Sequence, residues 1–76
     1  MRIATLNING VNRRLTNLLD WLEATRPDVA CLQELKVAEP DFPRAAIERA
    51  GYGAVWRSQS AWNGVAILAR DAEPIV

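Results

Sequence analysis

Apolar and polar positions follow two different periods along the chain, and each change of period marks a predicted element. Nearly continuous apolar runs predict one strand over residues 2–6 and another over residues 28–33. Such runs are typical of strands that are covered on both faces in a parallel or mixed α/β sheet. The segment between them has the apolar spacing i, i+4, i+7, i+8 and i+11, which predicts one buried helix face formed by Val11, Leu15, Leu18, Leu19 and Leu22.

The helix between these two strands is bounded by residues that favour helix ends. We expect Asn12 to cap its first turn through the side chain. We expect the helix to end at Arg26, because the residue before Pro27 disfavours the helical region. Strand, helix and strand within about thirty residues make a βαβ unit, whose two strands are expected to be parallel.

The remaining pattern predicts a loop, a second helix and a hairpin. Pro43 is expected in the first turn of the second helix. The polar turn that follows residue 57 has a length that favours an antiparallel hairpin. The predicted segments are a loop over residues 37–43, a helix over 43–50, strands over 52–57 and 64–70, and the start of a further strand at 75–76. The predicted order is therefore β-α-β-α-β-β, an α/β fold.

Length and composition narrow the class of protein without identifying a function. The chain has 76 residues, 50% of them apolar, and nine basic against nine acidic side chains. This composition is globular, but a chain this short buries only about 60% of its unfolded surface and is marginally stable. Zero net charge excludes a general electrostatic attraction for nucleic acid and leaves only a local basic patch for that purpose.

Single residues and the absence of long apolar stretches indicate a compartment. No stretch reaches the ~20 apolar residues of a membrane span, so we expect a cytoplasmic protein. Cys31 lies in an apolar run and is expected to be a buried small residue in a reducing compartment. Trp21 and Trp56 are expected to pack against the core.

One pair of polar residues closes the two N-terminal strands. Asn7 and Glu34 follow the predicted parallel strands, at the end where ligands gather in open α/β sheets. A carboxylate and a carboxamide oxygen suit Mg²⁺, which usually takes one or two protein carboxylates and completes its shell with water and phosphate. Lys36 would point the same way if its strand continued, adding a cation beside a phosphate. The alternative is that Asn7 and Asn9 only form turns and that Glu34 is a solvated strand-end residue.

Four segments in register resemble the N-terminal part of the exodeoxyribonuclease III and apurinic/apyrimidinic endonuclease family. They are residues 3–10, residues 27–34 with Lys36, the pair Gly51-Tyr52, and residues 63–68. Their order and spacing match the family, and the similarity covers essentially the whole chain. The resemblance implies the endonuclease/exonuclease/phosphatase fold, a four-layered, deoxyribonuclease-I-like α/β sandwich of two packed sheets. Residues 1–76 would then be a partial domain whose C-terminal part is missing.

The resemblance also implies an activity and its residues. The activity is Mg²⁺- or Mn²⁺-dependent hydrolysis of phosphodiesters in double-stranded DNA, at abasic sites and 3′ ends, by a monomeric repair enzyme with no membrane association. Asn7 and Glu34 match the residues at the family's metal. The positions assigned to substrate are Asn9, Lys36, Arg13 and Trp62, and Gly64 matches the glycine that opens the second strand of the hairpin.

The sequence departs from the family pattern at several points. Position 6 is usually aromatic and is Leu6 here, position 35 is commonly threonine and is Leu35 here, and the arginine that commonly faces DNA at position 12 is replaced by Asn12, next to Arg13. The family mechanism needs a histidine paired with an aspartate, and this chain has no histidine. We therefore expect the 76-residue chain to be inactive by itself, to expose one face of its sheet and to be poorly soluble.

Two other functions stay open at this point. A non-catalytic nucleic-acid-binding or regulatory relative on the same fold would be expected to lose Asn7 or Glu34, whereas both are present. An unrelated small α/β interaction module would not be expected to carry the matched order of motifs. The basic side chains form either a phosphate-facing patch or a set of solvated charges: Arg13, Arg14, Arg57 and Lys36.

Overall fold

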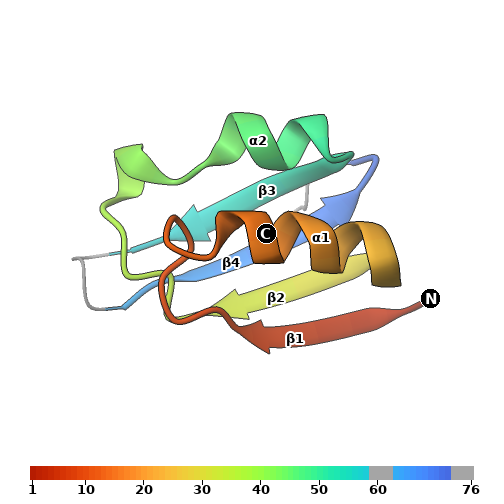
Figure 1. Ribbon diagram of the computed structural model, residues 1–76, viewed down its shortest axis with the longest axis horizontal. Helices are drawn as coiled ribbons and strands as arrows, with labels where there is room; N and C mark the ends of the chain where they lie inside the picture. The colour runs from red at the N-terminus through yellow and green to blue at the C-terminus, as the bar shows by residue number, and fades with distance from the viewer. Residues whose placement is uncertain (59–62, 73–76) are drawn as a thin grey trace.

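A computed structural model describes residues 1–58 and 63–72 of the chain. Within these residues the elements are β1 (Ile3–Asn7), α1 (Leu15–Thr25), β2 (Val29–Gln33), the 3₁₀ helix η1 (Glu39–Asp41), α2 (Arg44–Arg49), β3 (Tyr52–Arg57) and β4 (Val65–Arg70). The strands form one mixed sheet in the order β1-β2-β4-β3, and both helices lie in front of it (Figure 1). β1 is parallel to β2, while β4 is antiparallel to both β2 and β3. The predicted βαβ unit and hairpin are confirmed.

The core lies between the sheet and the two helices. On α1, Leu18 and Leu22 are fully buried, and Leu15 and Trp21 pack against the same cluster, which confirms most of the predicted apolar helix face. Val11 is buried but precedes α1, and Leu19 is only half-buried. The strands contribute the alternate residues that face the helices, namely Ala30, Leu32, Tyr52, Ala54, Ala66 and Leu68. Trp56 stacks on Phe42 with a centroid distance of 4.4 Å, as expected for a packing residue.

The opposite face of the sheet is bare. Ile3 is 65% exposed, Val65 55% and Ile67 38%. Cys31 and Val55 flank Ile67 in register on this face and are half-buried. Within the described residues both helices lie on the other face, so the apolar runs of the strands are covered on one face only (Figure 1). Cys31 is correspondingly not fully buried, and the expected exposure of one sheet face is confirmed.

The N-terminal boundary of α1 differs from its prediction. The helix begins at Leu15 with Arg14 at the cap position, and no side chain caps it. Asn12, the predicted cap, instead donates its Nδ2 to the carbonyl of Asp41 at 3.0 Å. The backbone N–H of Val11 donates to the carbonyl of Leu35 at 2.9 Å, so residues 11–14 are held as a turn by the loop after β2. Tertiary hydrogen bonds thus override the local capping preference.

The other differences are small. Residues 39–41, in the predicted loop, form η1. Pro43 occupies the cap position of α2 rather than its first turn. The end of α1 agrees with its prediction, since Arg26 follows the helix with a left-handed φ of 44°. The predicted strand start at 75–76 lies outside the described residues. In the part of the chain that the structure describes, no helix has the length and apolar character to span a membrane.

A polar clamp holds the sheet at the end where β1 begins. The Asp28 carboxylate accepts from the Arg2 backbone N–H and pairs with the Arg70 guanidinium, each at 2.7 Å. The Arg2 hydrogen bond and the nearby Arg70 charge lower the pKa of Asp28. Tyr52 donates its hydroxyl to the carbonyl of Pro27 at 2.7 Å, and burial raises the pKa of this phenol. The candidate site residues Asn7 and Glu34 lie at the opposite end of the sheet from this clamp.

Candidate functional site

The loops after β1 and β2 continue the backbone pairing of the sheet beyond the strand ends. Ile8 donates its N–H to the carbonyl of Gln33 at 3.0 Å, and Gly10 donates to that of Glu34 at 2.9 Å. On the other side, Leu35 donates to the carbonyl of Gly64 at 3.2 Å, and the N–H of Lys36 donates to Asn63 at 3.1 Å. The segment 34–36 is therefore fixed from both sides.

This short segment alternates between the core and the solvent. Leu35 is fully buried, whereas Glu34 and Lys36 are exposed. Both exposed residues have left-handed backbones, with φ of 56° and 52°. For residues with a Cβ this conformation costs about 1 kcal/mol each, and such strain concentrates at functional sites. The buried Leu35 and the flanking hydrogen bonds enforce the geometry.

Gly64 allows the close approach of β4 to this segment. Its φ of 128° is one that L side chains rarely adopt. A Cβ built on Gly64 would lie 2.8 Å from the Cβ of Ser58 and 3.0 Å from that of Leu35. The glycine that was matched to the family motif thus has a steric reason in this fold.

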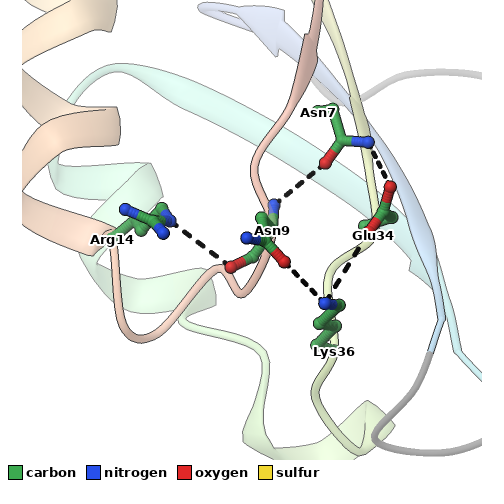
Figure 2. Close-up of polar contacts among 5 residues, drawn as sticks. All are labelled: Asn7, Asn9, Arg14, Glu34 and Lys36. Atoms are coloured by element: carbon green, nitrogen blue, oxygen red, sulfur yellow. Dashed lines mark hydrogen bonds and ion pairs between the residues drawn. The ribbon is translucent and has the colours of Figure 1, made fainter.

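Asn7 and Glu34 meet across the ends of the two parallel strands (Figure 2). Asn7 donates its Nδ2 to Oε2 of Glu34, and its Oδ1 accepts from the backbone N–H of Asn9 at 3.2 Å. The amide orientation follows from this pair of contacts, because only the nitrogen can donate to the carboxylate. In this structure the amide nitrogen of Asn7 therefore holds the Glu34 carboxylate in place.

Asn9 and Lys36 complete the cluster (Figure 2). The Nζ of Lys36 donates to Oδ1 of Asn9 at 2.5 Å and lies 3.7 Å from Oε1 of Glu34. Arg14, from the start of α1, donates its Nε to the backbone carbonyl of Asn9 at 3.4 Å. The two carboxylate oxygens therefore have different neighbours, a neutral amide on Oε2 and an ammonium near Oε1.

The donor chemistry of this cluster fits a hard divalent cation through one carboxylate. Among the described residues, no three His, Cys, Asp or Glu side chains gather closely enough to hold a metal. Mg²⁺ needs only one or two carboxylates when water and phosphate fill the rest of its octahedron. Glu34 fits that role. For Asn7 to act as a second ligand, its amide would have to turn so that Oδ1 faces the metal, and this ligand assignment stays a prediction.

The structure brings together four of the six residues assigned from the sequence: Asn7, Asn9, Glu34 and Lys36. Lys36 reaches the cluster through its left-handed backbone rather than through a continued strand, since β2 ends at Gln33. Arg13 is exposed beside Gly10 on the same loop. Trp62 lies outside the described residues.

Arg14 is the contact that sequence reasoning did not place in the site. The sequence places Arg14 only in a set of basic side chains that form either a phosphate-facing patch or solvated charges, because nothing in the helical pattern distinguishes it from Arg13. A cavity of about 400 Å³ lies between the end of β1 and α1, and Asn7, Asn9, Arg14 and Trp21 are among its lining residues. The cluster thus borders solvent on the α1 side as well.

Comparison with known proteins places this geometry in a family. Residues 4–72 match the model of the Endonuclease/Exonuclease/phosphatase family. The chain is 36% identical, over all of its 76 residues, to exodeoxyribonuclease III of Haemophilus influenzae, and it spans 28% of that protein's length.

Solved structures agree with the sequence match. An AP endonuclease from Archaeoglobus fulgidus superposes with a TM-score of 0.87 at 40% identity. The match covers 91% of this chain and 27% of the endonuclease chain. A 3′ phosphatase from Neisseria, bound to a product DNA hairpin, gives a TM-score of 0.88 at 43% identity, covering 92% and 27%. The chain belongs to the Endonuclease/Exonuclease/phosphatase family. Its fold is the N-terminal part of a deoxyribonuclease-I-like α/β sandwich, and its relatives by sequence and structure include exodeoxyribonuclease III and AP endonucleases.

Proposed function

We propose that this chain supplies one half of the active site of a Mg²⁺- or Mn²⁺-dependent DNA-repair nuclease. The reaction is hydrolysis of phosphodiesters in double-stranded DNA at abasic sites and 3′ ends, by a monomeric protein of the cytoplasm. The observation that carries the proposal is the contact between Asn7 and Glu34, with Lys36 beside it, at the carboxyl end of two parallel strands.

The similar proteins support the choice of substrate. The chain spans about a quarter of their lengths, so the activity of a whole protein is inferred here by similarity. Names printed for these proteins include an exodeoxyribonuclease, an AP endonuclease and a phosphatase that holds a DNA hairpin. These share DNA as the substrate and a phosphate ester as the bond that is broken.

Each residue of the cluster has a part in this reaction. A divalent cation, when bound, would neutralise the scissile phosphate and stabilise the leaving 3′ oxygen. Glu34 would hold that cation, and Asn7 fixes the rotation of the carboxylate through Oε2. Lys36 would contribute a positive charge toward the substrate phosphate, and in this structure its ammonium donates to Asn9. This chain has no histidine, so activation of the attacking water is not assigned to it.

The test uses the natural protein whose coding sequence contains this chain. Cleavage of an abasic-site duplex and of a 3′-recessed duplex is measured with Mg²⁺ for the wild type, Glu34→Gln and the control Glu23→Gln. Glu23 is an exposed glutamate of α1. We expect Glu34→Gln to lower kcat/KM by at least about 100-fold without changing the melting temperature, since a metal ligand is lost. The isolated 76-residue chain is expected to give negligible cleavage.

The same experiment separates this proposal from its main competitor. DNA binding without cleavage in the wild type, unchanged in Glu34→Gln, would favour a non-catalytic nucleic-acid-binding or regulatory protein. Near-normal Mg²⁺-dependent cleavage by Glu34→Gln would remove Glu34 from the mechanism.

A further inference from the structure

We propose that Lys36 is a built-in counter-ion of Glu34 that a divalent cation displaces, so that this side chain tunes the metal affinity of the site. The inference rests on the proposed function, because it takes Glu34 as the residue that holds the cation. It adds a competition between two positive charges for one carboxylate.

The geometry leaves a single carboxylate oxygen to be contested. Oε2 of Glu34 accepts from the amide of Asn7, whereas Oε1 faces the Nζ of Lys36 at 3.7 Å. A cation that coordinates Oε1 would need the space into which this ammonium extends, and two positive charges at that distance repel each other. The side chain of Glu34 is 47% exposed and that of Lys36 is 38% exposed, so an ion can reach the pair from solvent.

Lys36 has a second partner that keeps it at the carboxylate. Its Nζ donates to Oδ1 of Asn9 at 2.5 Å, and the Asn9 carbonyl in turn accepts from Arg14. The position of the ammonium is therefore defined by the loop after β1 as well as by Glu34. Displacement by a metal must break the contact between Lys36 and Asn9 as well as the ion pair.

Displacement of the ammonium must come from the side chain of Lys36, because the backbone of this segment is held in place. Leu35 is fully buried, and the segment is hydrogen-bonded on both sides. A lysine has a flexible four-carbon stem that can swing its ammonium away at small cost. After such a swing the ammonium is available to an anionic group such as a substrate phosphate.

The expected effect is modest because the pair is solvent-exposed. Exposed ion pairs are weak, so removal of the competitor should tighten metal binding roughly two- to fivefold. We measure Mn²⁺ binding to the natural protein that contains this chain, from the free Mn²⁺ signal in electron paramagnetic resonance. Lys36→Met removes the charge and keeps the chain length, Lys36→Arg retains the charge, and Glu34→Gln removes the carboxylate.

Arg49→Met is the matched control for the change in net charge, because Arg49 is exposed at the end of α2. We expect tighter Mn²⁺ binding in Lys36→Met only, and loss of the site in Glu34→Gln. Equal Mn²⁺ affinities in the wild type and Lys36→Met, or equal tightening in Arg49→Met, would overturn the inference.

A second measurement follows the displacement itself. Labelling lysine with ¹³C at Cε reports on the ammonium, and the resonance of Lys36 is the one that is absent from Lys36→Arg. Titration with Mg²⁺ should shift this resonance in the wild type, with saturation, and should leave it unchanged in Glu34→Gln. A Lys36 resonance that stays unchanged while Mn²⁺ binds at Glu34 overturns the competition and leaves the proposed metal site intact. Binding of Mn²⁺ that is insensitive to Glu34→Gln, or no binding, overturns the proposed metal site and this inference together.

Discussion

Asn7 donates its side-chain amide to the Glu34 carboxylate, although the two residues are 27 positions apart in the sequence. The contact exists because β1 and β2 are parallel and in register, with Asn7 opposite Gln33. Glu34 then turns back with a left-handed backbone, which brings its carboxylate to the amide. The parallel pairing of β1 and β2 therefore brings the two residues together, and the left-handed backbone of Glu34 directs its carboxylate toward Asn7.

Replacement of Asn7 by aspartate tests what this contact does. Asn7→Asp places a second carboxylate against Glu34, so we expect a loss of about 1 kcal/mol of stability at low salt. A divalent cation that bridges the two carboxylates should reverse the loss. Thermal unfolding with and without Mg²⁺ measures this loss, and Arg49→Met, which makes the same change in net charge at an exposed position of α2, is the control. If Mg²⁺ stabilises Asn7→Asp no more than the wild type, the pair is not at a cation site.

Gly64 offers a test of the loop that carries Glu34. In Gly64→Ala the new Cβ would clash with Ser58 and Leu35, in addition to backbone strain, so we expect a loss of about 2–3 kcal/mol. Gly51→Ala is the matched control, because Gly51 also has a positive φ but the nearest atom to its Cβ would be 3.8 Å away. Its cost should be about 1 kcal/mol. Urea unfolding compares the two, and equal losses would contradict the steric role of Gly64.

The clamp around Asp28 predicts the response of stability to acid. The pKa of Asp28 in the folded protein lies below its ordinary value of 3.8, chiefly because of the hydrogen bond from the Arg2 backbone and the Arg70 charge. A lowered folded pKa stabilises the fold above pH 3.8, and that contribution is lost as the pH falls through the folded pKa.

Asp28→Asn removes this contribution at neutral pH. Urea unfolding should therefore show a stability difference between wild type and Asp28→Asn that is constant near neutrality and shrinks below pH 3.8. Asp20→Asn, on the exposed face of α1, is the control. A difference that does not change with pH would show that the clamp acts through shape rather than charge.

Most of the fold could be predicted from apolar periodicity. The period of α1 and the continuous runs of β1 and β2 identified the βαβ unit, because burial of one helix face and of alternate strand residues follows from sequence spacing. The cap of α1 could not be predicted, since Asn12 is bound by Asp41, a residue 29 positions away. The bare sheet face follows from the resemblance to one part of a larger fold, whereas continuous apolar runs alone do not reveal which face is covered in the described residues.

The site could be predicted in membership but not in orientation. Strand ends and family motifs predicted that Asn7, Asn9, Glu34 and Lys36 lie together, and the contacts confirm this clustering, while their function stays a prediction. The direction of the Asn7 amide and the approach of Lys36 depend on left-handed backbones at Glu34 and Lys36, which sequence propensity disfavours for residues with a Cβ. Arg14 was missed as a site contact for a related reason, since its bond to Asn9 depends on the late start of α1.

The bare face of the sheet gives the last prediction. Ile67 and Leu68 are neighbours on β4 that point to opposite faces, Ile67 to the bare face and Leu68, fully buried, to the helices. Ile67→Thr keeps a β-branched residue and removes exposed apolar surface, so it should reduce self-association and dye binding with a change in stability below about 0.5 kcal/mol.

The matched variant on the covered face should behave in the opposite way. Leu68→Thr buries a hydroxyl and leaves a cavity, and it should cost about 3 kcal/mol or unfold the chain. Sedimentation velocity, binding of a hydrophobic dye and urea unfolding distinguish the two variants. Unchanged self-association in Ile67→Thr would mean that this face does not mediate self-association. A large loss of stability in that variant would mean that Ile67 is covered in solution, as it would be if another sheet packed on it.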